Sequence, residues 1–163
     1  MPTPDLDAID RRIIAALQDD GRLSNVDLAE RVGLSPSPCL RRVKRLERDG
    51  AIAAYRALPQ RSRVGLGLTV FIGVKIDGHG NERAATLEEA ILAMPEVIAA
   101  HMVSGEADYL IEVVVPDLEH YQRFLVDTLL SLPVVKEVRS NFAIQTLKVA
   151  APLPLNHLTV AER

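Results

Sequence analysis

Basic side chains are concentrated in one short segment of this 163-residue chain, between Ser35 and Arg48. The segment carries five basic residues and one acidic residue, although the net charge of the whole chain is −3. Lysine and arginine neutralise DNA phosphates, and this neutralisation supplies most non-specific affinity for DNA. An arginine can also donate two hydrogen bonds to the edge of a guanine. The local charge therefore indicates contact with nucleic acid.

On a helix, the polar residues of this segment would share one face. The face consists of Ser37, Arg41, Lys44 and Arg48, with Arg42 and Arg45 beside it and Ser35 at the helix start. The face predicted to be buried consists of Cys39, Leu40, Val43 and Leu46. A solvated basic face that pairs with Glu47 or Asp49 is the plainer alternative. We predict that all seven polar residues of the first set contact DNA.

A helix-turn-helix would position these side chains. Ser24 can cap a first short helix, and Gly33 supplies the left-handed residue that ends it. Ser35 can cap the second helix, with Pro36 at its first position, where the missing amide costs no hydrogen bond. The second helix of such a motif enters the major groove of DNA. Residues 1–58 are therefore predicted to form a DNA-binding domain, with double-stranded DNA as the partner.

Two further elements are predicted in this domain, followed by a linker. Asp7 can cap a helix that runs to about residue 20. Residues 51–58 indicate a short strand, the wing of a winged helix-turn-helix. The polar, proline-marked residues 59–63 are typical of a linker, which we place over residues 59–68.

After the linker the hydrophobic pattern changes from helical to alternating. Strands are predicted at 69–76, 97–104, 107–115 and 136–149, and helices at 82–94 and from Asp117 to about residue 132. The order β-α-β-β-α-β is that of the ferredoxin-like unit, here over residues 69–150. The fold class is therefore α+β. Residues 151–163 have no regular period, and the pattern leaves open an extended, packed tail or a frayed end.

The predicted strands are apolar on both faces. In the third strand one face carries Tyr109, Ile111, Val113 and Val115, and the other carries Leu110 and Val114. Two helices cover only one face of a four-stranded sheet, so we predict that a second copy of the sheet covers the other, giving a homodimer. The alternative is an antiparallel face that stays partly solvated.

The segment from Ser104 to Tyr109 is a candidate binding loop. An amino-acid zwitterion needs amides or hydroxyls for its carboxylate, and an acidic group or carbonyls for its ammonium group. Gly105 allows close approach of the backbone, and Glu106 or Asp108 supplies negative charge. A simple hairpin turn explains the same residues, with Asp108 in a local hydrogen bond. The residue types leave both interpretations open.

The chain resembles the Lrp/AsnC (feast/famine) family of bacterial transcription regulators. The resemblance rests on three segments in the family's order: LDAIDRRIIAALQDDGRLSNVDLAERVGLSPSPCLRRVKRLERDGAI, GEADYLIEVVVPDLEHY and VRSNFAIQTLKV. It implies a helix-turn-helix followed by a ferredoxin-like sensing domain. It also implies pairing through the sensing domain, further assembly, often to octamers, and a free amino acid bound between subunits at the loop of residues 104–109.

The closing segment is most similar to regulators of branched-chain amino-acid metabolism and to leucine- or methionine-responsive members. The resemblance places Ser140, Asn141 and Phe142 in the effector cleft of a neighbouring subunit. Met102 is a candidate for lining an apolar pocket, although a core methionine is the commoner explanation. With an apolar cleft, the effector is leucine- or methionine-like. The candidate effector-binding residues are Met102, Ser104, Gly105, Glu106, Asp108, Tyr109, Ser140, Asn141 and Phe142.

The sequence gives little support to other chemistries. The single cysteine excludes an intramolecular disulfide and a cysteine-based zinc site, and the four histidines lack metal-ligand spacing. We therefore expect no metal, no cofactor and no catalytic residue. Without a signal peptide or a long apolar run, we expect a cytoplasmic protein that does not enter a membrane. The alternative function is a siroheme-decarboxylase-like enzyme of the same architecture, which the dense basic helix with its Ser-Pro start disfavours.

Overall fold

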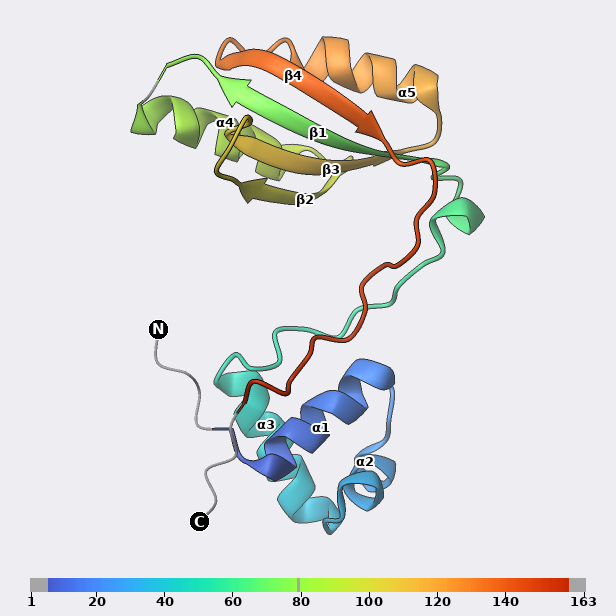
Figure 1. Ribbon diagram of the computed structural model, residues 1–163. Helices are drawn as coiled ribbons and strands as arrows, with labels where there is room; N and C mark the ends of the chain where they lie inside the picture. The colour runs from blue at the N-terminus through green and yellow to red at the C-terminus, as the bar shows by residue number, and fades with distance from the viewer. Residues whose placement is uncertain (1–5, 79, 159–163) are drawn as a thin grey trace. The chain divides into compact units, whose positions relative to one another are not determined.

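The computed structural model describes residues 6–78 and 80–158 (Figure 1). These residues form two compact units. The first unit combines residues 6–58 with residues 148–158, and the second consists of residues 59–147.

Three helices form the first unit: α1 (Ala8–Asp19), α2 (Asn25–Val32) and α3 (Pro36–Arg48). The predicted starts of α1 and α2 are confirmed, because Asp7 closes a capping box on α1 and Ser24 accepts a hydrogen bond from the Asp27 amide. Gly33 ends α2 at a φ of 72°, which favours glycine. The buried side chains between the helices are those of Ile13, Ala16, Leu28, Ala29, Val32, Cys39 and Leu46.

Three predictions for this unit differ from the structure. Ser35 occupies the N-cap position of α3, but its side chain forms no capping hydrogen bond. Leu40 is 42% exposed, so its predicted burial is wrong. Residues 51–58 contain no strand, because the described part of this unit offers no neighbouring strand to accept the ladder hydrogen bonds that a wing needs.

The second unit has the predicted β-α-β-β-α-β order. A short 3₁₀ helix, η1 (Arg61–Val64), precedes the sheet. The elements that follow are β1 (Leu68–Ile76), α4 (Asn81–Ala93), β2 (Val97–Met102), β3 (Tyr109–Val115), α5 (Leu118–Arg123) with its π-helical continuation η2 (Phe124–Leu129), and β4 (Val135–Phe142). The sheet order is β2-β3-β1-β4, and all its pairs are antiparallel. The α+β fold class and the ferredoxin-like topology are therefore confirmed.

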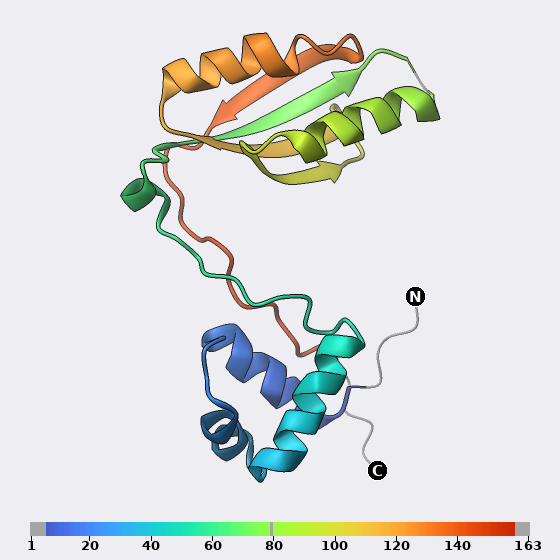
Figure 2. The ribbon, with the colours of Figure 1, turned by 180° about the vertical axis from the view of Figure 1, so that it is seen from behind.

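One face of this sheet is covered and the other is open. Helices α4 and α5 lie on the same side of the sheet (Figure 2). On the covered face, Ile72 of β1 lies opposite Ile111 of β3, and both are fully buried. Phe71 and Leu110 point to the open face, where they are 39% and 37% exposed. The predicted covered set of β3 (Tyr109, Ile111, Val113 and Val115) is confirmed.

The last strand is shorter than predicted and its continuation has another partner. Strand β4 ends at Phe142, near the residue at which its partner β1 begins, Leu68. Beyond Phe142, one more ladder hydrogen bond forms, from the Ala143 amide to the Thr69 carbonyl. Residues 148–158 join the first unit. There the Gln18 side-chain amide pairs with both backbone groups of Leu153, at 2.7 and 3.3 Å. The described tail is thus extended and packed on α1; residues 159–163 lie outside the described residues.

Candidate DNA-binding and effector sites

The predicted basic face of α3 is exposed to solvent. Its four members, Ser37, Arg41, Lys44 and Arg48, all lie on the surface. Arg48 contacts the neighbouring Asp49, with 3.0 Å between Nε and Oδ1. Within residues 6–78 and 80–158, Arg41 and Lys44 form no ion pair. These cations therefore present their charge to solvent along one side of the helix.

The start of α3 is suited to an anion. Its first turn contains no acidic residue, and the Ser35 hydroxyl does not cap the helix. The first amides of a helix lack partners and carry partial positive charge, so they attract phosphate. Because Pro36 and Pro38 have no amide hydrogen, Ser37 supplies the one amide of the first three helical residues. Asn25 of α2 donates a 2.8 Å hydrogen bond to the Pro36 carbonyl and so ties this end to the preceding helix. Sequence reasoning missed Asn25, because its contact with Pro36 depends on the angle between α2 and α3, which the sequence does not show.

Arg42 and Arg45 have a different environment from the exposed face. The carboxylate of Asp10 on α1 accepts a 2.8 Å hydrogen bond from Nη1 of Arg42 and another from Nη2 of Arg45. Asp7 accepts a further bond from Arg42, at 2.6 Å. The two arginines line a shallow hollow together with Leu34, Pro38 and Arg41. Sequence reasoning missed Asp10, although it stands three residues after the cap, where the capping box places an acidic side chain.

The Asp7 carboxylate links the cap of α1 to the basic helix. Burial raises the pKa of Asp7, but hydrogen bonds from the Asp10 amide and from Arg42 outweigh it, and the pKa lies below its ordinary value of 3.8. A carboxyl with a lowered folded-state pKa stabilises the fold above the unfolded pKa. This stabilisation is lost as the pH falls from 3.8 through the lower folded-state pKa.

We expect Asp7→Ala to reduce the free energy of unfolding by about 1 kcal/mol near neutral pH, because a capping side chain is removed. The difference from the unsubstituted protein should shrink as the pH falls below 3.8, and it should be smallest below the lower folded-state pKa, where Asp7 is protonated in both states. Urea unfolding at a series of pH values measures it. Asp19→Ala is the control, since Asp19 is an exposed α1 carboxylate that pairs with Arg31. A loss that stays constant down to strongly acidic pH contradicts the assignment.

The loop between β2 and β3 contains the predicted effector residues. Gly105 has a φ of 130°, a conformation that other residues adopt only with strain. The Asp108 carboxylate accepts a 2.9 Å hydrogen bond from the Ile76 amide, so its charge is engaged within the fold. Ser104 and Glu106 are exposed. Of the two candidate carboxylates, Glu106 is the one on the surface.

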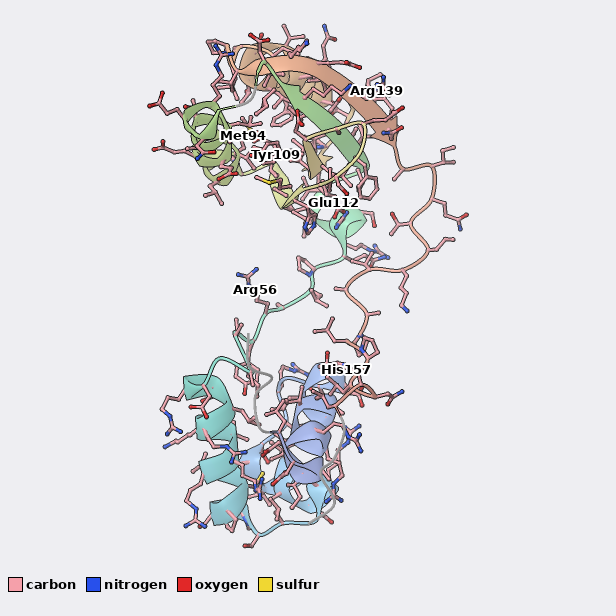
Figure 3. The ribbon with its side chains drawn as sticks, turned by 60° about the vertical axis from the view of Figure 1, so that its left-hand side comes forward. Arg56, Met94, Tyr109, Glu112, Arg139 and His157 are labelled. Carbon is pink, nitrogen blue, oxygen red and sulfur yellow. The ribbon has the colours of Figure 1, made fainter. Side chains whose placement is uncertain are left out.

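Glu106 has one basic partner that sequence reasoning missed. Arg139 of β4 forms ion pairs with Glu106 and, at 2.9 Å, with Glu137. The Glu137 carboxylate and the Glu106 charge raise the pKa of Arg139. Arg139, labelled in Figure 3, lies on β4. In the register of β1 and β4 it is opposite Gly73. This neighbour of the loop becomes visible only once the strands are paired.

Tyr109 connects the end of the loop to helix α4 (Figure 3). Its ring is buried, and its hydroxyl donates a 2.7 Å hydrogen bond to the Glu88 carboxylate. Burial and the nearby Glu88 raise the pKa of Tyr109 to about 12. The tyrosine therefore stays protonated and acts as a fixed donor near neutral pH.

The three β4 residues predicted for the cleft point in two directions. Ser140 and Phe142 lie on the covered face, where the Phe142 ring meets that of Tyr121 edge-on at 5.3 Å. Asn141 lies on the other face and donates to the Phe71 carbonyl at 3.4 Å. Phe142 is paired with Val70 of β1, whereas the loop ends at Tyr109, which is paired with Val74. The four positions between Val70 and Val74 correspond to roughly 13 Å along the strand. Within one chain, the structure does not bring Phe142 to the loop.

Met102 lies at the end of β2, next to the loop, and is 69% exposed. It is therefore not a core methionine, and its thioether is available to an apolar group. Among the residues described, no group of three His, Cys, Asp or Glu side chains could hold a metal ion. In the same part of the chain, no helix has the length and apolarity needed to span a membrane.

Both units match known families. Residues 6–53 match the winged helix-turn-helix DNA-binding family, and residues 69–153 match the Lrp/AsnC ligand binding domain. The chain belongs to the Lrp/AsnC family. The leucine-responsive regulatory proteins of Klebsiella pneumoniae and Escherichia coli K12 are each 42% identical to it over 147 residues, which is 90% of this chain and 90% of theirs.

Two solved structures of transcriptional regulators extend this similarity. A transcriptional regulator from Neisseria meningitidis in complex with L-Met is 42% identical, with a TM-score of 0.91 over 94% of this chain and 99% of that chain. An AsnC family transcriptional regulator from Agrobacterium tumefaciens is 36% identical, with a TM-score of 0.89 over 94% of this chain and 100% of that chain. The resemblance drawn from the three sequence segments is therefore confirmed.

Proposed function

We propose that this protein is a DNA-binding transcriptional regulator whose DNA binding or assembly responds to a small apolar amino acid. The observation that carries the proposal is the presence of both family domains in one chain that is 42% identical to leucine-responsive regulatory proteins. The L-Met complex of the Neisseria relative supports an apolar amino acid as the effector. No observation favours the siroheme-decarboxylase-like alternative, and the proposed activity is not enzymatic.

DNA contact is assigned to the exposed face of α3. Arg41 and Lys44 present unpaired charge on this face, and Arg48 and Ser37 extend it toward the two ends of the helix. The Ser35 hydroxyl and the Ser37 amide at the helix start are placed to meet a backbone phosphate. Together these groups supply both the phosphate contacts that set affinity and the base contacts that set sequence preference.

The effector is assigned to the loop of residues 104–108. Backbone amides around Gly105 and the Ser104 hydroxyl receive the carboxylate of the amino acid, while Glu106 attracts its ammonium group. Met102 is exposed beside the loop and contacts the apolar side chain. Asp108 and Tyr109 hold the loop in place through Ile76 and Glu88. Asn141 lies on the open face of β4 and completes the cleft from a neighbouring subunit. Ser140 and Phe142 lie on the covered face against Tyr121, so they support the strand and do not contact the effector.

Pairing is assigned to the open face of the sheet. Phe71 and Leu110 remain partly exposed there, which is the surface that a second copy of the sheet buries. A symmetric dimer presents two copies of α3 to successive major grooves of one duplex, about 34 Å apart. Further assembly, to an octamer, follows the family's pattern.

A thermal-shift screen of the twenty amino acids tests the effector. We expect methionine and leucine to stabilise the protein, by about 2.7 kcal/mol at a hundredfold excess over Kd. The control variant is Gly105→Val, because a β-branched residue is strained at the φ of 130° found there. This variant should lose the shift and keep its DNA binding in a mobility-shift assay without effector. If none of the twenty amino acids shifts the unfolding temperature, the effector assignment is wrong. DNA binding is tested separately, by the mobility-shift assay.

A further inference from the structure

Asp10 is the only charged side chain that is buried among the described residues. An ionised carboxylate inside a protein is costly unless it is paired and hydrogen-bonded. Asp10 meets this requirement with Arg42 and Arg45 and with the Asp7 amide, which donates to it at 3.2 Å. Both arginines belong to the helix that we assign to DNA, whereas Asp10 belongs to α1.

The contacts divide the basic residues of α3 into two groups. Arg42 and Arg45 are directed toward two carboxylates, Asp7 and Asp10, so the charges of this group cancel. Arg41, Lys44 and Arg48 lie on the exposed face of the helix and retain their charge toward solvent, apart from the contact of Arg48 with Asp49. The helix therefore presents three cations to DNA, and not the five that its sequence carries.

We propose that Asp10 is a positioning residue for DNA recognition: it withholds Arg42 and Arg45 from the DNA and fixes the orientation of α3, so that Arg41, Lys44 and Arg48 face the duplex. The inference rests on the proposed DNA-binding function and deepens it. It also revises the prediction that all five basic residues contact DNA.

The salt dependence of DNA binding reports this division directly. The logarithm of the binding constant falls with the logarithm of salt concentration with a slope of about −0.9 for each phosphate that is neutralised. Arg45, once released from Asp10 and turned toward DNA, would steepen the slope by up to about 0.9 for each copy of α3, because Arg42 keeps its ion pair with Asp7. Loss of a purely structural carboxylate would change the stability of the unit and leave this slope unaltered.

The test uses Asp10→Asn in the full-length protein, with random-sequence DNA and with the protein's own operator. Asparagine keeps the shape of the side chain and removes its charge. We expect a steeper salt slope on random DNA, tighter non-specific binding at low salt, and a smaller ratio of operator to random affinity. Asp19→Asn is the matched control, because it makes the same charge change on the same helix at an exposed pair with Arg31. It should leave the slope unchanged.

A second pair of variants decides the question if Asp10→Asn folds poorly. Arg45→Gln should leave the salt slope on random DNA at the unsubstituted value, whereas Arg41→Gln should reduce its magnitude by about 0.9 for each copy of α3. Circular dichroism verifies that both variants are folded. An equal reduction for Arg45→Gln and Arg41→Gln overturns the inference, because Arg45 would then neutralise a phosphate. If the unsubstituted protein binds no DNA at all, the proposed function fails instead.

Discussion

Arg41→Ala is expected to relax the base preference of DNA binding, whereas Arg48→Ala is expected to weaken binding to all sequences alike. Arg41 lies in the N-terminal half of α3. In a recognition helix, side chains of the N-terminal half reach the base edges. A bidentate contact of arginine with guanine contributes about 1–3 kcal/mol of discrimination, so its loss in both copies of a dimer changes the preference by roughly one to four orders of magnitude. Arg48, at the end of the helix, is assigned to phosphate and carries no base information.

Competition binding with a set of operator variants separates the two effects. For Arg41→Ala the affinities for operator and mutated operators should converge, while for Arg48→Ala they should fall in parallel. Arg83→Ala is the control for the loss of one charge, because Arg83 is an exposed residue of the second unit that pairs with Asp77. Parallel losses on every sequence for both α3 variants would falsify the assignment of base contact to Arg41.

Local sequence chemistry predicted the helix-turn-helix well. The caps at Asp7, Ser24 and Gly33 act between near neighbours in the chain, so residue type and spacing are sufficient to locate them. The basic face of α3 follows from the helical period alone. By contrast, the wing strand could not be excluded, since a strand depends on a partner that local pattern does not reveal.

Two of the missed contacts join distant parts of the chain. The pairing of Asp10 with Arg45 joins residues 35 positions apart, and the pairing of Gln18 with Leu153 joins residues 135 apart. Periodicity contains no information about such contacts. The same reason explains why Arg42 and Arg45 could not be separated from Arg41 and Lys44, although all four stand on one helix.

The candidate effector site shows a similar division. The residue types from Ser104 to Asp108 were sufficient to select the loop, but both of its carboxylates turned out to have partners. Asp108 holds the loop to β1, as the hairpin interpretation requires, while Glu106 meets Arg139 at the surface. The hairpin and effector interpretations therefore apply to different residues of the same loop. Whether an amino acid binds at this loop is the question that the Gly105→Val variant addresses.

The second large expected effect concerns Ile72, which is fully buried in the central strand β1 between Ile111 of β3 and Ser140 of β4. We expect Ile72→Ala to reduce the free energy of unfolding of the second unit by about 2–5 kcal/mol, because it removes buried methyl groups and leaves a cavity. A domain of this size is stable by about 5–15 kcal/mol, so the loss is a large share of the total. Urea unfolding, with the β-sheet signal followed separately from the helical signal, measures it.

The same variant tests whether DNA binding depends on pairing through the sheet. Linking two copies of α3 raises the apparent affinity by about 10²–10⁴ without any new contact. At a temperature where the second unit of Ile72→Ala is unfolded, DNA affinity should fall by at least two orders of magnitude, although α3 is unchanged. Ile98→Ala makes the same substitution at a residue of β2 that is 51% exposed, and it should alter the free energy of unfolding by less than about 0.5 kcal/mol. If Ile72→Ala keeps its DNA affinity while the sheet signal is lost, the helix-turn-helix binds DNA without the pairing that we assign to the open face.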